Sequence, residues 1–119
     1  MKKIFISQGM INRTEEEIRV EREECIKDLR DFVKERFNDD IEIIDSIIKE
    51  DPPEGCNAGV WFLGQSLISM SKADFVASLP RCVHYRGCRI ESTAADEYGI
   101  PQIVFDDDAI YFCDKSMTS

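Results

Sequence analysis

Short runs of β-branched and aromatic residues alternate with longer amphipathic stretches along this chain, and this alternation constrains the fold more than any other feature. The run KIFIS (3–7) is apolar enough for a buried strand. Thr14 and Glu17 then form a capping box, which predicts a helix that continues to about Phe37. The apolar side chains of this helix recur at helical spacing at Ile18, Cys25, Ile26, Leu29, Phe32 and Val33.

The same alternation continues to residue 113. Strands are predicted at 41–45, 73–79 and 101–105, and helices at 58–72 and 88–98, the latter ended by Gly99. A fifth strand is expected at 109–113, either at the sheet edge or in a hairpin through residues 106–108. The segment DPPEG (51–55) is predicted to be a loop. The second helix is expected to bury Val60, Leu63, Leu67, Ile68 and Met70.

Strands that alternate with helices favour right-handed crossovers and a parallel sheet. We therefore predict one domain over residues 1–119, an α/β three-layer sandwich with four or five mostly parallel strands in the order 2-1-3-4(-5). Ligands of such sheets bind beyond the carboxyl ends of the strands, where the strand order reverses. The loops after strands 1 and 3 are then expected to face one crevice.

Composition narrows the classes of partner. The formal net charge of -9 argues against a nucleic acid polymer, because phosphate contacts need a basic face. No apolar stretch is long enough for a membrane span, and the N-terminal run is too short for the core of a signal peptide. Five cysteines without a CxxC pair favour reduced thiols and a cytoplasmic location.

The loop after strand 1, SQGMINR, carries the first group of candidate site residues. Ser7 and Gln8 offer hydrogen bonds, Gly9 allows close backbone approach, and Arg13 is a candidate partner for an anion near the start of the first helix. The alternative interpretation is an ordinary strand-to-helix turn that contains a glycine and an exposed arginine.

The stretch RCVHYRGCRIE (81–91) is the second group, since it gathers three arginines and the only histidine in an acidic chain. Arg86 and Gly87 are expected just before a helix, with Glu91 in its first turn. The helix dipole there helps to keep a carboxylate ionised, which suits a nucleophile or an acceptor for a hydroxyl. Alternatively, Glu91 only complements the dipole and the arginines are solvated.

Four segments together resemble the nucleoside 2-deoxyribosyltransferase-like superfamily, in particular its small uncharacterised branch related to nucleotide N-glycosidases. They are FISQGM, WFLGQSL, ADFVASL and RGCRIESTAADEYGIP. The resemblance implies a flavodoxin- or Rossmann-like fold, a homo-oligomer and no cofactor. It also implies that Glu91 is a nucleophile that forms a glycosyl-enzyme intermediate, and that Ser7, Gly9 and Arg13 hold a 5′-phosphate.

Two supporting groups of the catalytic members are missing. The usual tyrosine near the end of strand 1 is absent, and the acid expected eight residues before Asp74 is Ser66. Asp74 itself is interpreted as a structural residue. The function implied is binding of a nucleoside or nucleotide, extending to cleavage or transfer of its N-glycosidic bond. The alternative is a non-catalytic binder that senses or sequesters a nucleotide-derived molecule.

Further candidates border the crevice in this prediction. Met10 belongs to the loop after strand 1, Asp45 is a candidate acceptor for a sugar hydroxyl or a turn cap, and Trp61 is a candidate base-stacking or core residue. His84 and Tyr85 either contact a base or fill their loop. Cys82, His84 and Cys88 lack an apparent fourth zinc ligand, and residues 106–108 suit an exposed turn, so no metal is expected.

Overall fold

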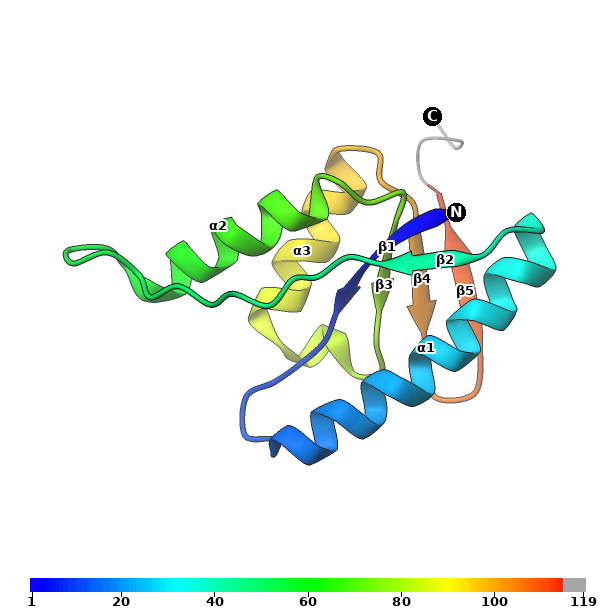
Figure 1. The fold of residues 1–119 in the computed structure, drawn as a ribbon, viewed down its shortest axis with the longest axis horizontal. Coiled ribbons are helices and arrows are strands. Elements are labelled where there is room, and N and C mark those ends of the chain that lie inside the picture. Colours follow the sequence, from blue (N-terminus) through cyan, green and yellow to red (C-terminus); the bar gives the residue numbers. More distant parts are fainter. Residues whose placement is uncertain (115–119) are drawn as a thin grey trace.

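The computed structural model describes residues 1–114, which form one sheet flanked by helices (Figure 1). The elements follow the predicted alternation of strand and helix. In chain order they are β1 (Lys2–Ser7), α1 (Glu15–Phe37), β2 (Ile41–Ile43), α2 (Ala58–Met70), β3 (Phe75–Ser78), the 3-10 helix η1 (Cys82–His84), α3 (Arg86–Glu97), β4 (Gln102–Phe105) and β5 (Ile110–Cys113).

The sheet has the strand order β2-β1-β3-β4-β5, which confirms the predicted order. The first four strands are parallel, and β5 runs antiparallel to β4. Asp106 donates its backbone N–H to the carbonyl of Ala109, at 2.9 Å, so the last two strands form the hairpin that was one of the two alternatives.

Strands β2 and β3 are shorter than predicted, for local reasons. After Ile43, only the N–H of Ile44 still bonds to β1, at the carbonyl of Ile4. Ala73 belongs to the turn that ends α2, and the side chain of Asp74 accepts a 2.7 Å hydrogen bond from the N–H of Lys3. Asp74 therefore has the structural role expected for it.

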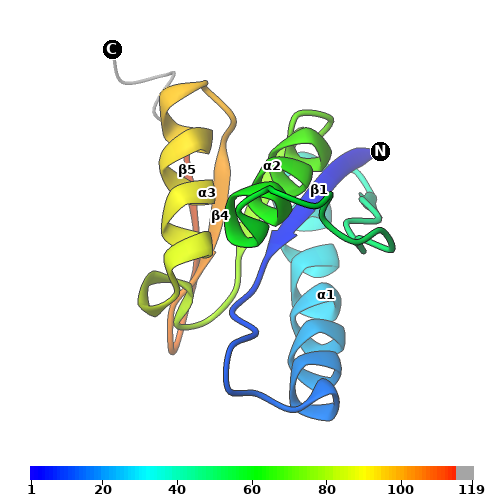
Figure 2. The ribbon, with the colours of Figure 1, turned by 90° about the vertical axis from the view of Figure 1, so that its left-hand side faces the viewer.

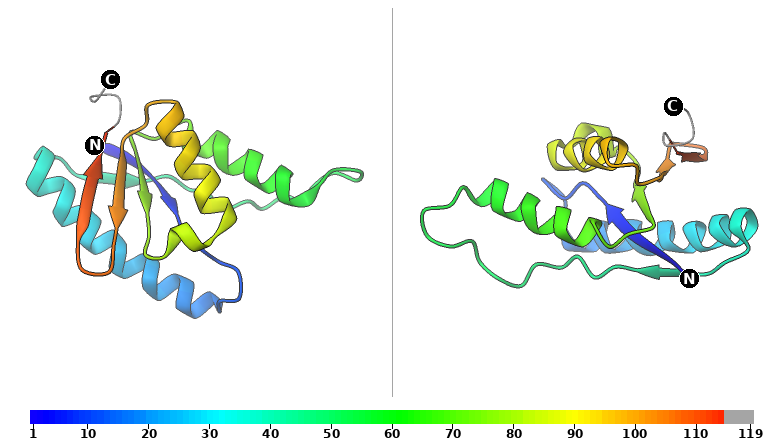
Figure 3. Two further views of the ribbon diagram at one scale, coloured as in Figure 1. Left: turned by 180° about the vertical axis from the view of Figure 1, so that it is seen from behind. Right: turned by 90° about the horizontal axis from the view of Figure 1, so that it is seen from above.

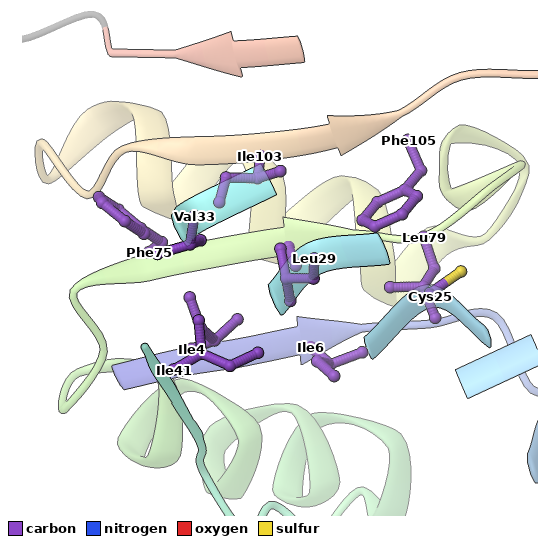
Figure 4. Packing of buried hydrophobic residues seen from close by; sticks show 11 residues of the cluster. Ile4, Ile6, Cys25, Leu29, Val33, Ile41, Phe75, Leu79, Ile103 and Phe105 are labelled. Carbon is purple, nitrogen blue, oxygen red and sulfur yellow. The ribbon is translucent and has the colours of Figure 1, made fainter. Parts of the chain in front are cut away.

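Helix α1 covers one face of the sheet, and α2 and α3 cover the other (Figures 2 and 3). Because side chains of a strand alternate between faces, Ile4 and Ile6 point towards α1 while Phe5 points towards α2 and α3. The larger core lies on the α1 side (Figure 4). Its buried members are Ile4, Ile6, Cys25, Leu29, Val33, Ile41, Phe75, Ala77, Leu79, Ile103 and Phe105.

The bounds of α1 confirm the capping signals. The hydroxyl of Thr14 accepts a hydrogen bond from the N–H of Glu17 at 3.1 Å and donates to its carboxylate, also at 3.1 Å. At the other end Asn38 adopts a left-handed conformation and its N–H bonds to the carbonyl of Lys34. The side chain of Thr14 and the left-handed backbone of Asn38 therefore fix the two ends of the helix.

Helix α2 departs from its predicted packing. Only Met70 is buried, Leu63 and Leu67 are half-buried, and Val60 and Ile68 are 65% and 57% exposed. Apolar side chains lie all around this helix, so their spacing did not specify which side faces the core. The N-terminal part of α2 and the loop before it also extend past the sheet (Figures 1 and 3). The prediction that Val60 and Ile68 are core residues is therefore wrong.

Candidate functional site

The carboxyl ends of β1 and β3 lie side by side, as expected of the switch point in the strand order. Ser7 and Ser78 are register partners, and the N–H of Leu79 donates to the carbonyl of Ser7 at 3.0 Å. The loops that follow these two strands therefore start from the same edge of the sheet, which is the placement predicted for the crevice.

Ser7 and Glu91 are in direct contact at this edge. The Ser7 hydroxyl donates a 2.7 Å hydrogen bond to Oε1 of Glu91, and the two residues are only 1% and 8% exposed. Ser7 continues the side of β1 that faces α3, and Glu91 shares the inward face of α3 with Cys88 and Ala95. Two residues 84 positions apart are thus brought together by the two crossovers that place β3 beside β1.

The environment of Glu91 differs from the prediction in two respects. Because α3 begins at Arg86, after the extended residue Tyr85, Glu91 lies in the second turn rather than the first. Burial raises the pKa of Glu91 above its ordinary value of 4.5, and the hydrogen bond from Ser7 partly offsets this. Desolvation, rather than the helix dipole, therefore dominates the protonation of this carboxyl group.

Ser7→Ala is expected to raise the pKa of Glu91 further, because the ionised carboxylate loses the hydrogen bond from Ser7 while its burial stays the same. Carboxyl carbon chemical shifts followed by NMR as a function of pH measure this directly. Ser78→Ala is the matched control, since Ser78 is a buried serine in register with Ser7 whose hydroxyl bonds to Gln102 instead. An unchanged Glu91 titration in Ser7→Ala contradicts this account.

Tyr85 closes the site over Gly9. A Cβ atom on Gly9 would lie 2.1 Å from Cε2 of the Tyr85 ring, so only glycine allows the ring to pack there. The close approach predicted for Gly9 is therefore made by a side chain of the same chain. Tyr85 therefore fills its loop, which is one of the two roles considered for it.

Gln8 and Arg13 lie on the opposite side of the sheet from Glu91, against α1. Nε2 of Gln8 donates to the carbonyl of Ile18 and to Oε1 of Glu21, at 2.9 and 3.1 Å. Nη1 of Arg13 donates to the carbonyl of Gly9 at 2.8 Å and to Oε1 of Glu21 at 2.9 Å. The arginine expected to bind a ligand anion is thus paired with a carboxylate of its own chain.

Glu21 is the residue that the sequence analysis missed. Its side chain is largely buried, pairs with Arg13, and lies 3.5 Å from Nη2 of Arg81. A signal existed, because Glu21 occupies the same helical stripe as Ile18 and Cys25 and interrupts it with a charge. The pairing with Glu21 ties the loop after β1 to α1.

The three arginines of residues 81–91 do not converge on one point. Arg81 approaches Glu21, and Nη1 of Arg89 donates to the carbonyl of Val83 at 2.9 Å. Arg86 is exposed at the first position of α3 and has no hydrogen bond or ion pair with the other described residues. Gly87 follows it, with open space where a Cβ atom would lie. Of the three, Arg86 remains available to an anionic group.

The remaining candidates lie apart from the Ser7–Glu91 pair. Asp45 accepts a hydrogen bond from the N–H of Ile47 at 3.1 Å, which is its turn-capping alternative. The ring of Trp61 packs edge-on against Phe62, with centroids 5.1 Å apart. Met10 is exposed and Ser66 is half-buried on α2. None of the four makes a hydrogen bond with Ser7, Gly9 or Glu91 within residues 1–114.

A buried polar network anchors α3 beside the site. Oε1 of Gln102 accepts hydrogen bonds from Ser78 and Ser92, and its Nε2 donates to Asp96 at 2.6 Å and to the carbonyl of Ser92. A glutamine in an otherwise apolar strand was the signal for this network. Because the network joins β3, β4 and α3, it fixes the helix that presents Glu91.

Two cavities flank the pair without including it. One, of about 840 Å³, lies between α1 and the loops after β3 and β4, and is lined largely by carboxylates such as Glu21, Glu24 and Asp28. The other, of about 590 Å³, lies between α3 and β4, and Cys82 and Cys88 line it. Neither is lined by Ser7 or Glu91, and both of these residues are buried.

The described residues meet neither the requirements of a metal site nor those of a membrane-spanning helix. Within residues 1–114, no three histidine, cysteine, aspartate or glutamate side chains are placed to hold a metal ion, including Cys82 with His84 and the run 106–108. In the same range, no helix combines the length and hydropathy needed to cross a bilayer.

Comparison of the chain with protein-family models, curated proteins and solved structures gave no significant match. The fold and site therefore define a mostly parallel α/β protein with a buried serine–glutamate pair at its switch point.

Proposed function

We propose that this protein binds a nucleoside or nucleotide at the switch point and cleaves or transfers its N-glycosidic bond. The observation that carries the proposal is the 2.7 Å hydrogen bond between Ser7 and Glu91, buried where the carboxyl ends of β1 and β3 meet. A carboxylate held in this way at the switch point of the sheet is chemically suited to attack a sugar carbon.

In the proposed reaction the ionised Glu91 attacks the anomeric carbon, the bond to the base breaks, and a glycosyl ester forms. Water or a second base then resolves the ester and restores the carboxylate. The Ser7 hydroxyl holds Oε1 of Glu91 and favours its ionised form. Arg86, at the exposed start of α3, is the candidate partner for a phosphate, with the N-terminal N–H groups of the helix.

Opening of the site is part of the proposal. The Tyr85 ring occupies the space over Gly9, next to the start of α3, and its displacement would free a space that suits a flat group such as a base. Rotation of the half-buried Tyr85 side chain requires no change in the sheet or in the hydrogen-bond network of Gln102.

A non-catalytic binder is the second candidate, and two observations favour it. Burial raises the pKa of Glu91, which disfavours the ionised form that a nucleophile needs. The family that the sequence resembles also implies an acid at the position of Ser66, and a serine is not an acid at neutral pH. A protein of this kind would sense or sequester a nucleotide-derived molecule without cleaving it.

Assembly into a homo-oligomer also belongs to the proposal. No charged residue lies between Glu54 and Lys72, a segment that includes all of α2, although the chain carries a formal net charge of -9. Two like-charged copies repel least across an uncharged face, and exposed apolar side chains there gain from burial. A cytoplasmic location, expected from the cysteines, stays a prediction.

A thermal-shift screen with nucleosides, nucleoside monophosphates and ribosylated signalling compounds tests the proposal, with each stabilising compound incubated and analysed by mass spectrometry for free base. A hit that releases base supports the enzyme, whereas a hit recovered intact supports the binder. If no compound of these classes raises Tm for the wild-type protein or for Tyr85→Ala, the proposed function is wrong.

A further inference from the structure

Two buried thiols lie together beside the site, in a place that the proposed reaction does not use. Cys82 opens η1 and Cys88 lies in the first turn of α3, and they are 7% and 5% exposed. Both line the cavity of about 590 Å³ between α3 and β4, together with His84 and Arg89. The cavity gives small molecules a route to the two sulfur atoms.

The sulfur of Cys82 has three polar neighbours. It lies 3.2 Å from the carbonyl oxygen of Ser7 and 3.4 Å from the Ser7 hydroxyl, and it interacts with the side chain of Cys88. Cys82 has a single S–H proton to donate among these neighbours. The two cysteines and Ser7 thus form one connected cluster.

Interactions within this cluster shift the pKa values of the two thiols in opposite directions. Interaction with Cys88, together with burial, raises the pKa of Cys82, whereas interaction with Cys82 lowers the pKa of Cys88 against the effect of burial. Arg89 also lowers the pKa of Cys88, as a position near a helix N-terminus does. Cys88 is therefore the sulfur that ionises first, with Cys82 as its neutral neighbour.

We propose that Cys88 and Cys82 form a redox site that is oxidised by hydroperoxides through the cavity between α3 and β4. The geometry places two buried thiols on the wall of one cavity, where their side chains interact, which is the arrangement of a thiol with its resolving cysteine. The proposal is independent of the proposed function, because it requires no nucleoside and no role for Glu91.

The reaction consumes one hydroperoxide. The Cys88 thiolate attacks the O–O bond, takes one oxygen as a sulfenic acid, and releases water from hydrogen peroxide once a proton is added. Cys82 then attacks the Cys88 sulfur, the S–O bond breaks, and a second water leaves. Together the two thiols lose two electrons and two protons, and a disulfide forms. The carbonyl of Ser7 then loses the S–H neighbour that it has in the reduced protein.

The test treats the full chain with hydrogen peroxide, blocks the remaining thiols by alkylation, and maps cysteine linkages by peptide mass spectrometry. The expected result is the loss of two of the five alkylatable thiols, with a linkage between Cys82 and Cys88. Five thiols that remain alkylatable, or a linkage through the exposed Cys56 or Cys113, would overturn the proposal.

Variants assign the order of attack. Cys88→Ser is expected to slow the first oxidation about tenfold or more, and Cys82→Ser to stop it at a sulfenic acid that a dimedone-type reagent labels on Cys88. Cys25→Ser is the matched control, because Cys25 is also buried but its pKa is raised to about 11 by that burial. Rapid labelling of Cys82 in Cys88→Ser, without labelling of Cys88 in Cys82→Ser, would contradict the order of attack.

Discussion

Glu91→Gln is expected to reduce glycosidic cleavage on the order of 10⁴-fold or more, while the protein stays folded and still binds its ligand. Glutamine has the shape of glutamate, and its Oε1 can still accept the hydrogen bond that Ser7 donates. It cannot form the glycosyl ester, however, because an amide oxygen is a poor nucleophile. Loss of product with retained binding therefore identifies Glu91 as the reacting group.

The same substitution is expected to stabilise the fold at pH 8. Because burial raises the pKa of folded Glu91 above 4.5, the stability that this group contributes is complete below the unfolded value and is lost as pH rises through the folded pKa. At pH 8 the wild-type protein holds a buried charge that Glu91→Gln lacks. The variant should gain on the order of 1–2 kcal/mol, or roughly 4–8 °C in Tm.

Differential scanning calorimetry at pH 8 and pH 4, with product analysis at pH 8, measures both effects. The gain in Tm should shrink at pH 4, below the ordinary pKa of 4.5, because Glu91 is then mostly protonated in both the folded and the unfolded state. Glu54→Gln is the control, because it removes the same charge from an exposed loop residue. A Glu91→Gln variant that is less stable than wild type at pH 8 contradicts the account of the buried charge, and full cleavage by the variant eliminates the nucleophile.

The double variant Val60→Glu/Ile68→Glu is expected to convert a homo-oligomer into monomers. These exposed residues lie about two helical turns apart on α2, with Gly64 between them, so that a second copy can approach the helix closely. Two new carboxylates would have to be desolvated in an interface between chains that already carry a formal net charge of -9. The loss should be on the order of several kcal/mol of association free energy.

Analytical ultracentrifugation at equal protein concentrations measures this effect. Val20→Glu is the matched control, since it places a carboxylate at an exposed valine on another helix, α1. A wild-type protein that sediments as a monomer rules out the proposed assembly. An oligomer that persists in the double variant places the interface on a different surface.

The fold was largely predictable because its signals are local. Thr14 and Glu17 cap α1 through contacts within one turn, and the alternation of strand and helix directs the strand order through the handedness of crossovers. The packing of α2 was not predictable in the same way. When apolar side chains lie on every side of a helix, their spacing does not indicate which side faces the core. Helix α2 also extends past the end of the sheet.

The site was predicted in part. The crossover rule placed the loops after β1 and β3 together, and the contact between Ser7 and Glu91 follows from it. Strand alternation should have separated Gln8 from Ser7, because successive side chains of an extended chain point to opposite faces. The protonation of Glu91 depends on how deeply α3 buries it, and the packing of Tyr85 on Gly9 depends on side-chain positions that no local pattern specifies.

The central claim is that a nucleoside or nucleotide binds beside Ser7 and Glu91. Amide chemical-shift mapping with the best compound of the thermal-shift screen tests it most directly, because each backbone N–H reports its own surroundings. The account predicts that the largest shifts occur at residues 7–9 and 85–91, on both sides of the Tyr85 ring. Largest shifts around Glu24, Asp28 and residues 106–108, in the acidic cavity beside α1, would contradict it.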